Sequence, residues 1–259
     1  MKLLVVGAGE MGRWFGEVVT RELEADGLDD VDLAFADADS GVAEATADEV
    51  AGRFVPLSTA ERFDAVCVAV PISVADEAIR THAEKAERAL VDVTGQMAEP
   101  VAAMAEVAPE RERVSLHPLF AAANAPGNVA MVADQTGPVT DRLLDALRAA
   151  GNDLVETTPE EHDDAMATVQ AGAHAAVLAF ALAAGDVPEG LTTPVFEDLT
   201  AVAEQVVGNE PRVYAEIQET FDGADEVAAA ARRLAEADEE TFAQLYREAG
   251  KSLQTEADE

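Results

Sequence analysis

The first half of the chain alternates short apolar runs with longer segments in which apolar residues recur at helical spacing. The runs are roughly four to six residues long and continuous rather than alternating, which is typical of strands covered on both faces. Helical patterns separate them, for example over residues 11–24 and 74–88. This alternation predicts an α/β fold with a doubly wound parallel sheet. Six runs are the predicted strands: Leu3–Val6, Leu33–Ala36, Ala65–Val70, Leu90–Val93, Val114–Leu116 and Val129–Val132.

The second half of the chain has helical patterns only. Thr158 is the expected N-cap of the first helix, because acidic residues fill the turn that follows it. The stretch 175–184 is apolar nearly all round, so we expect burial in a helical bundle or against a second subunit. The pattern predicts two domains, 1–158 with the sheet and 159–259 all-α. The predicted helices are 163–184, 195–207, 211–221, 226–237 and 239–252.

The charge balance narrows the setting in which this protein works. The 259 residues contain 52 Asp and Glu against 17 Lys and Arg, a net charge of −35, and lysine occurs only at 2, 85 and 251. A hydrophobic content of 49% still allows a normal core. Such a surface is typical of a halophilic protein, since molar salt shortens the Debye length to about 3 Å. Nucleic acid and anionic membranes are excluded as partners, because binding them needs Lys and Arg.

The single cysteine, the histidines and the apolar runs argue against a disulfide-bonded, a membrane or secreted, and a metal-binding protein. Cys67 lies in an apolar run and is expected to be buried, without a disulfide. We see neither an 18-residue apolar stretch nor a signal-peptide layout, which predicts a cytoplasmic protein. No metal site is predicted, because one cysteine and separated histidines do not supply a ligand set.

A glycine motif follows the first predicted strand. Gly7, Gly9 and Gly12, with Glu10 and Met11 between them, fit G-x-G-x-x-G and open a helical pattern. Gly7 allows a tight turn, Gly9 lets the backbone approach a pyrophosphate, and Gly12 lets the helix pack on the strand. In this position the motif predicts a Rossmann-type dinucleotide-binding domain; the alternative is a purely structural glycine turn.

The second predicted strand ends at Asp37, 25 positions after Gly12. A carboxylate there accepts hydrogen bonds from ribose hydroxyls, whereas an Arg would favour a 2′-phosphate. We therefore expect NAD rather than NADP. The alternative is that Asp37 is one more surface acid with no role in cofactor binding. The turn at Val70 and Pro71 ends another strand, and we expect it beside the cofactor.

Of the four histidines, two lie in polar surroundings and two in distinctive ones. His82 and His162 are predicted to be solvated. His117 follows a strand and precedes a proline, which exposes its ring at the carboxyl end of that strand. Gln170 and His174 share one face of an apolar helix, where a core histidine bonded to a carbonyl is the alternative.

Taken together, these segments resemble the prephenate/arogenate dehydrogenase family over residues 2–222, and the acidic composition resembles haloarchaeal members. The resemblance rests on the glycine motif, on the turns at 68–71 and 92–95, on His117-Pro118-Leu119-Phe120, and on Glu161-His162-Asp163 followed by Gln170 and His174.

The resemblance implies an oxidative decarboxylation. In it His117 acts on the C4 hydroxyl of prephenate, hydride passes to NAD, and loss of carbon dioxide gives 4-hydroxyphenylpyruvate, a step of tyrosine biosynthesis. His174 lines the substrate site and, with Gln170, orients the substrate. The resemblance also implies an all-α C-terminal domain that forms a homodimer.

Two positions depart from the family pattern. Relatives carry a Ser in the turn that here reads Thr94-Gly95-Gln96, so Thr94 is the candidate for a catalytic hydroxyl. Relatives also carry an Arg where this chain has Ala201. A dianionic substrate needs a cation. Arg212 is the first candidate, ahead of Arg113 and Lys2, and the alternative for Arg212 is an exposed helix-start residue.

Three hypotheses remain open from the sequence. The first is an NAD-dependent prephenate dehydrogenase, with arogenate not separable from prephenate. The second is another dehydrogenase of the 6-phosphogluconate-dehydrogenase-like group, against which the absence of Lys from the 163–184 helix counts. The third is a catalytically silent nucleotide-binding relative, against which the presence of both His117 and His174 counts.

Overall fold

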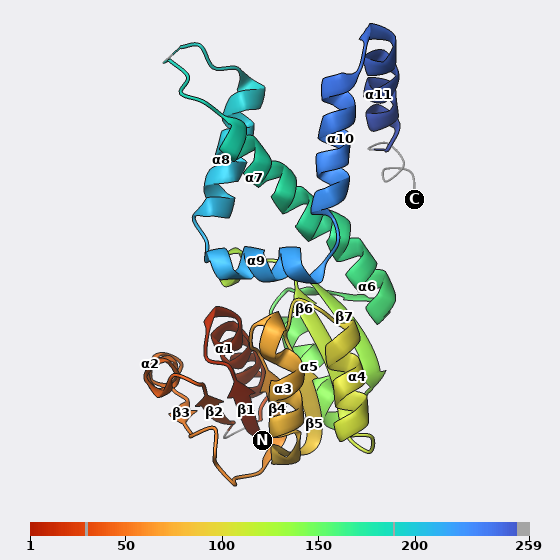
Figure 1. The fold of residues 1–259 in the computed structure, drawn as a ribbon. Coiled ribbons are helices and arrows are strands. Elements are labelled where there is room, and N and C mark those ends of the chain that lie inside the picture. The colour runs from red at the N-terminus through yellow and green to blue at the C-terminus, as the bar shows by residue number, and fades with distance from the viewer. Residues whose placement is uncertain (29–30, 189, 253–259) are drawn as a thin grey trace. The chain divides into compact units, whose positions relative to one another are not determined.

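The computed structural model describes residues 1–28, 31–188 and 190–252 (Figure 1). The chain divides into two compact units, Met1–Ala165 and Met166–Glu259. The division falls inside a helical run that begins at Pro159. Each unit is described by itself.

The first unit is built on an eight-stranded sheet with the order β3-β2-β1-β4-β5-β6-β7-β8 (Figure 1). All neighbouring strands are parallel except β6 and β7, because the short connection between them leaves no room for a crossover. The predicted Rossmann-type, doubly wound sheet is confirmed, with this one antiparallel pair. The strands are β1 Lys2–Val6, β2 Asp32–Ala36, β3 Arg53–Phe54, β4 Phe63–Val68, β5 Ala86–Asp92, β6 Glu112–Pro118, β7 Asn128–Gln135 and β8 Asp153–Glu156.

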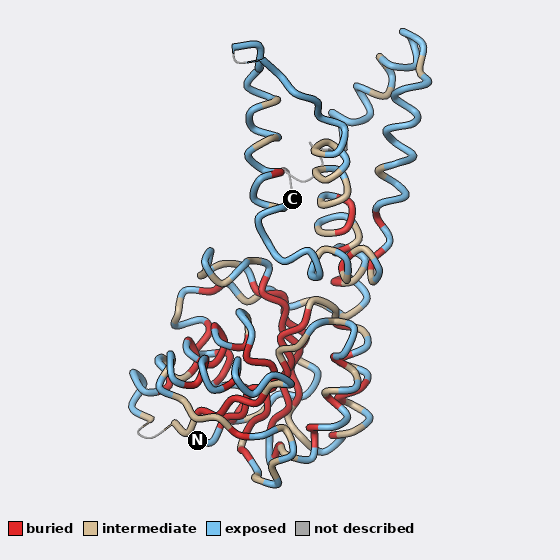
Figure 2. The backbone as a smooth tube through the Cα atoms, turned by 60° about the vertical axis from the view of Figure 1, so that its left-hand side comes forward, coloured by how far each residue is buried: buried red, intermediate tan, exposed pale blue. Residues whose placement is uncertain are grey.

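Helices cover both faces of this sheet. Leu3 and Val5 of β1 pack into one core cluster, with α1 and α5, whereas Leu4 and Val6 pack into the other, with α3 and α4. This explains the continuous apolar runs: in the central strands, successive residues are buried on opposite faces of the sheet (Figure 2). Cys67 is fully buried in β4, as predicted. The helices are α1 Glu10–Ala25, α2 Ser40–Glu49, α3 Ile72–His82, α4 Ala98–Val107, α5 Pro138–Ala149 and α6 Pro159–Met166.

All six predicted strands are present, and two further strands were missed. β3 has only two residues and β8 carries acids at both ends, so neither gives an apolar run. The helix predicted over 74–88 is too long: α3 ends at His82, and β5 begins at Ala86.

All secondary-structure elements in the described part of the second unit are helices, as predicted. After α6, a π-helical turn η3 (Ala167–Gly172) leads into α7 (Ala173–Ala183), which packs on α8 (Pro194–Val207). α9 (Pro211–Thr220), α10 (Ala224–Glu236) and α11 (Glu239–Ser252) complete the unit. No residue of α7 is buried among the described residues. The prediction that this apolar helix is buried in a bundle of its own chain is therefore wrong, and burial against a second subunit stays a prediction.

The helical run Pro159–Ala183 is long and apolar enough to cross a membrane by length and composition. The expectation that no such stretch exists is therefore wrong, because Thr, Gln and His interrupt the apolar residues without adding charge. A single helix of this kind is weak support for a membrane span, since helices that pack against other protein have the same composition.

Candidate active site

The glycine loop lies at the carboxyl edge of the sheet, between β1 and α1. Gly7 has a φ of +100°, and a Cβ there would lie 2.1 Å from the carbonyl oxygen of Ala69. A Cβ on Gly12 would lie 1.9 Å from the carbonyl oxygen of Gly7. A Cβ on Gly9 would meet nothing within 4 Å. Only glycine fits the first two positions, and the third leaves the N-terminus of α1 open to an anion, so these residues fit a bound pyrophosphate.

Asp37 holds this loop in place from the end of β2. Its Oδ2 accepts a hydrogen bond from the backbone N–H of Ala8 at 2.8 Å, and its Oδ1 accepts one from Asp39 at 2.9 Å. Each carboxylate oxygen keeps a second lone pair, so the same side chain has the capacity to accept ribose hydroxyls. Asp37 is thus placed where the sequence motif requires an acid.

The other predicted cofactor residues surround the same loop. Glu10 accepts a hydrogen bond from the backbone N–H of Ala122 at 2.8 Å, which ties the start of α1 to the segment after β6. Met11 is half-buried against the core, and Val70 lies beside Gly7. Pro71 is the N-cap residue of α3. The structure therefore brings these four residues to one edge of the sheet.

His117 lies next to the end of β6 and is 8% exposed. Its Nδ1 is 2.9 Å from Nε2 of His162, and the two rings meet edge to face. Burial and, to a smaller extent, the neighbouring His162 lower the pKa of His117 to about 3, while Asp163 acts in the opposite direction. His117 is therefore neutral around pH 7, which is the state that a base requires.

His162 is buried, so the prediction that it is solvated is wrong. Its side chain is 1% exposed, and Nδ1 lies 2.7 Å from Oδ1 of Asp163. Thr158 and Glu161 form the predicted helix start, each side chain accepting from the other's backbone N–H. The acidic residues at the helix start indicated a solvated segment, but the His162 side chain is buried. The Asp that directly follows it in the sequence was the one feature that could have indicated a hydrogen-bonded, buried histidine.

His82 is also buried rather than solvated. It is 6% exposed at the end of α3, and burial lowers its pKa. The charged residues next to it in the sequence, such as Arg80 and Glu84, are exposed. Nothing places it near the glycine loop or His117.

Thr94 lies in the turn that follows β5 and is 2% exposed. Its hydroxyl is 2.6 Å from Oδ1 of Asp92 and 3.0 Å from the carbonyl oxygen of Gln96. Burial raises the pKa of Asp92 to about 7, against the hydrogen bonds from Thr94. These contacts show that the Thr94 side chain orders the turn.

Gly95 is the residue of this turn that approaches the His117 ring. A Cβ on Gly95 would lie 3.8 Å from Nε2 of His117 and 3.0 Å from Cδ1 of Ile72. The turn and His117 therefore form one group at the carboxyl edge of the sheet. Sequence reasoning missed Asp92, Gly95 and Ile72 as neighbours of this group, because their proximity is set by the sheet.

In the second unit, His174 of α7 contacts Tyr214 of α9. The ring centroids are 4.7 Å apart, and burial lowers the pKa of His174. Nδ1 of His174 is buried and makes no hydrogen bond within the part of the chain that the structure describes. Gln170 is half-buried in η3, one turn earlier. Tyr214 carried no signal in the sequence.

The candidate cations lie in different places. Arg212, in the first turn of α9, is 63% exposed and pairs with Glu216 at 2.8 Å. Arg113 and Lys2 lie at the amino ends of β6 and β1, at the opposite edge of the sheet from His117. Arg113 is buried there against Asp134 and backbone carbonyls. Both are therefore wrong as substrate-binding candidates.

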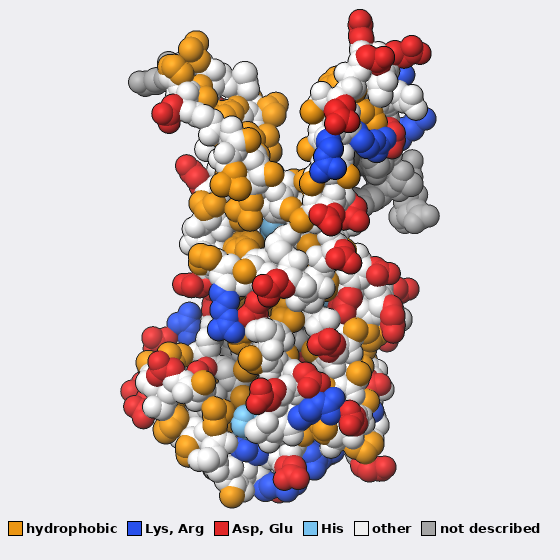
Figure 3. All heavy atoms as spheres, viewed as in Figure 1, with side chains coloured by type: hydrophobic (Ala, Val, Ile, Leu, Met, Phe, Trp, Pro, Cys, Tyr) orange, Lys and Arg blue, Asp and Glu red, His pale blue; other side chains and the backbone are white. Residues whose placement is uncertain are grey.

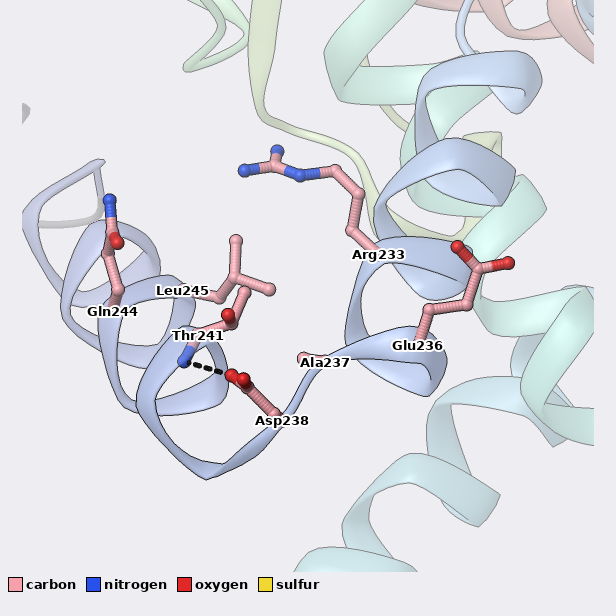
Figure 4. Close-up of a pocket in the computed structure, with 7 residues that line it drawn as sticks. All are labelled: Arg233, Glu236, Ala237, Asp238, Thr241, Gln244 and Leu245. Carbon is pink, nitrogen blue, oxygen red and sulfur yellow. Dashed lines mark hydrogen bonds between the residues drawn. The ribbon is translucent and has the colours of Figure 1, made fainter.

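A pocket in the second unit lies at the turn between α10 and α11 and contains none of the predicted site residues (Figure 4). Arg233 and Leu245 line it, and Asp238 accepts a hydrogen bond from the N–H of Thr241 at the start of α11. Among the described residues no group of three His, Cys, Asp or Glu side chains is placed to hold a metal ion.

The sequence is similar to known dehydrogenases. Residues 20–134 match the family described as prephenate dehydrogenase, nucleotide-binding domain. The 4-amino-4-deoxyprephenate dehydrogenase of Streptomyces pristinaespiralis is 30% identical, over 95% of this chain and 88% of that protein. A probable arogenate/prephenate dehydrogenase of Methanocaldococcus jannaschii is 26% identical over 78% of this chain, which spans half of that protein's length.

The fold is also similar to solved structures. The prephenate dehydrogenase of Aquifex aeolicus, crystallised with hydroxyphenyl propionate and NAD+, superposes with a TM-score of 0.70 over 98% of both chains, at 17% identity. A putative prephenate dehydrogenase of Corynebacterium glutamicum gives a TM-score of 0.68, at 20% identity, over 99% of this chain and 89% of the other.

Proposed function

This chain belongs to the prephenate/arogenate dehydrogenase family, and on that premise we propose that it converts prephenate to 4-hydroxyphenylpyruvate with NAD, as a step of tyrosine biosynthesis. One observation carries the proposal: a buried, neutral His117 at the carboxyl edge of the sheet, in one unit with the open glycine loop. Family membership sets aside the 6-phosphogluconate-dehydrogenase-like alternative.

The glycine loop and Asp37 hold the cofactor. The N–H groups at the start of α1 face the pyrophosphate, and the carboxylate of Asp37 accepts from the adenosine ribose. An acid at this position repels a 2′-phosphate, which supports NAD over NADP. When bound, NAD supplies the hydride acceptor.

His117 is the base in the reaction. Its Nε2 takes the proton of the ring C4 hydroxyl, so the O–H bond breaks as the N–H bond forms. The C4 hydrogen then leaves with its electron pair, and C4 becomes a carbonyl carbon. The electron pair of the bond from C1 to the carboxylate moves into the ring as carbon dioxide leaves. The resulting phenolate regains a proton, and aromatisation makes the sequence irreversible.

Residues of the second unit bind the substrate. His174 and Gln170, one helical turn apart, orient its polar groups, and Arg212 supplies the positive charge that Ala201 does not. Nδ1 of His174 is buried and has no hydrogen-bond partner among residues 1–28, 31–188 and 190–252. This supports a polar ligand there, since an unsatisfied buried nitrogen costs about 1–3 kcal/mol.

We assign the apolar surface of α7 and α8 to a second copy of this chain. Figure 3 shows hydrophobic side chains gathered over these helices, and Leu182 is 88% and Val195 69% exposed. Leu182→Glu is expected to convert a dimer to a monomer in sedimentation analysis at high salt. Val42→Glu, at an exposed valine of α2, is the matched control and should stay dimeric. A wild-type monomer, or partition of the protein into lipid vesicles, would contradict this assignment.

A ring-amino substrate is the second candidate. The relative that is 30% identical to this chain, over 95% of it, is named a 4-amino-4-deoxyprephenate dehydrogenase. Arogenate is the third substrate to compare, because the relative from Methanocaldococcus jannaschii is named for both arogenate and prephenate.

One assay matrix tests these candidates. Prephenate, arogenate and 4-amino-4-deoxyprephenate are each crossed with NAD and NADP in molar KCl, and reduction of the cofactor is followed. We expect the highest kcat/KM for prephenate with NAD. A higher value for the amino substrate would establish the second candidate, and no turnover in any combination would indicate a catalytically silent relative.

A further inference from the structure

Two side chains of the first unit, His162 and Asp163, extend a line of hydrogen bonds that starts at the candidate base, His117. Nδ1 of His117 is 2.9 Å from Nε2 of His162, and Nδ1 of His162 is 2.7 Å from Oδ1 of Asp163. His117 is 8% exposed, and the side chains of His162 and Asp163 are 1% and 18% exposed. Both hydrogen bonds are therefore largely shielded from water, which strengthens them.

Asp163 sets the direction of this line. Its carboxylate accepts hydrogen bonds from the backbone N–H groups of Met97 and Ala98 at 3.0 and 3.1 Å, at the start of α4. Burial pushes the pKa of Asp163 up, but the bonds from His162 and these two N–H groups hold it below its usual value. An ionised carboxylate only accepts, so Nδ1 of His162 must carry a proton.

The proton on Nδ1 of His162 determines the protonation of the other ring nitrogens in the line. In neutral His162, Nε2 has the lone pair and accepts from Nδ1–H of His117. Neutral His117 then has its second lone pair on Nε2, the nitrogen that lies beside Gly95. The hydrogen bonds therefore select the tautomer in which Nε2 is the basic atom.

We propose that His162 and Asp163 are positioning residues that hold His117 in its Nδ1–H tautomer and take up the Nδ1 proton when Nε2 is protonated. The proposal rests on His117 being the base of the proposed function. In the transfer, the substrate O–H bond breaks and Nε2–H of His117 forms, while Nδ1–H of His117 breaks and Nε2–H of His162 forms. The positive charge then lies on His162, next to the carboxylate of Asp163, rather than beside the reacting ring.

The start of α4 gives this line a fixed anchor. α4 begins two residues after Gln96, so Asp163 is hydrogen-bonded to the segment that continues from the Thr94–Gln96 turn. The turn that approaches Nε2 of His117 and the carboxylate that orients its Nδ1 are thereby held by the same backbone. Loss of Asp163 is expected to loosen both.

Nitrogen-15 NMR of the full chain at neutral pH, without substrate, reads the tautomer directly. We expect the His117 Nε2 signal to have the shift of an unprotonated nitrogen and Nδ1 that of a protonated one. The opposite pattern in the wild-type protein would overturn the proposal whatever the enzyme turns over. Absence of turnover with the expected tautomer would instead count against the proposed function.

Two substitutions of His162 distinguish its two proposed roles, which are to fix the tautomer of His117 and to take up the Nδ1 proton of His117. In His162→Gln, the amide is able to donate to Asp163 and accept from His117, so the tautomer is kept but no proton is taken up. In His162→Leu, both interactions are lost. We expect kcat to fall about tenfold in the first and about 10²-fold or more in the second, with KM within about twofold.

His82→Leu is the matched control, since it removes another buried histidine that lies away from the line. It should lower the unfolding midpoint without changing the His117 tautomer. A His162→Leu protein that folds and keeps the wild-type kcat would overturn the proposal. If that variant does not fold, Asp163→Asn tests the same line, with a mixed His117 tautomer expected and an unchanged one contradicting it.

Discussion

A Cβ on Gly95 would lie 3.8 Å from Nε2 of His117, so this glycine brings the turn after β5 against the His117 ring. The same position lies 3.0 Å from the tip of the Ile72 side chain. Gly95 thus lies between Nε2 of His117 and the tip of the Ile72 side chain.

Substitution of Gly95 is expected to affect activity in proportion to size. Alanine displaces only the flexible end of Ile72, so kcat/KM should stay within about threefold of wild type. Valine adds two further methyl groups beside Nε2 and keeps the C4 hydroxyl of the substrate away from that nitrogen. We therefore expect kcat/KM to fall about 10²-fold, which is within the usual contribution of a general base. Steady-state kinetics of both variants make the comparison, and a fully active Gly95→Val would show that Nε2 is not the reacting atom.

Asp92 makes the stability of the fold depend on pH. Its pKa is raised to about 7 by burial, above the unfolded value, so the folded state holds the proton more tightly and this contribution is lost as pH rises through about 7. Asparagine has no proton to lose, so the variant lacks this penalty. The free energy of unfolding of Asp92→Asn minus that of wild type should therefore increase by about 2–3 kcal/mol from pH 5 to pH 8.

The comparison with wild type is needed because buried histidines act in the opposite sense. His82, His117 and His174 have lowered pKa values, so they destabilise the fold as pH falls below about 6.5. Urea unfolding at both pH values measures the difference. Asp26→Asn, at an exposed position after α1, should follow wild type, and an Asp92→Asn curve parallel to wild type would contradict the assignment.

Asp37 is expected to set the cofactor preference. Asp37→Asn keeps an oxygen for the N–H of Ala8 but loses the negative charge, so kcat/KM with NAD should fall about tenfold and discrimination against NADP should shrink. Asp39→Asn is the control on the same segment, because asparagine caps α2 as well as aspartate does. An unchanged ratio of NAD to NADP in Asp37→Asn would remove this residue from the cofactor site.

The charge of −35 predicts a fold that needs salt. Raising KCl from 0.1 M to about 1 M shortens the Debye length from about 10 Å to about 3 Å, which screens most of the self-repulsion. The thermal unfolding midpoint should rise by more than about 10 °C over this range, since about 1 kcal/mol shifts it by 2–4 °C. Sucrose at equal osmolality is the control, and a midpoint that does not respond to KCl would contradict a halophilic protein.

The sheet could be predicted from the sequence because its strands are buried on both faces. Runs such as Leu3–Val6 are apolar at every position and are therefore visible without any partner. β3 and β8 lie at or near the ends of the sheet and are short or acidic, so they have no such signature. The antiparallel pairing of β6 with β7 depends on the length of a loop, which apolar periodicity does not report.

The candidate site could be predicted only where a motif has a fixed local geometry. The glycine loop and Asp37 belong to one βαβ unit, so their spacing determines where they lie. The contact of His117 with His162 joins residues 45 positions apart, and the sequence pattern around His162 indicated a solvated helix start. The ends of β5 and β6 are brought together by the sheet, which explains why Gly95 was not recognised as a neighbour of His117.

The central claim is that His117 is the base in an NAD-dependent oxidation of prephenate. Single-turnover formation of NADH, with enzyme in excess over prephenate in molar KCl, tests it most directly in wild type and His117→Asn. We expect wild type to form NADH and carbon dioxide in equal amounts, and the variant to bind NAD normally but react about 10²–10⁴-fold more slowly. NADH formation by His117→Asn at the wild-type rate would contradict the claim.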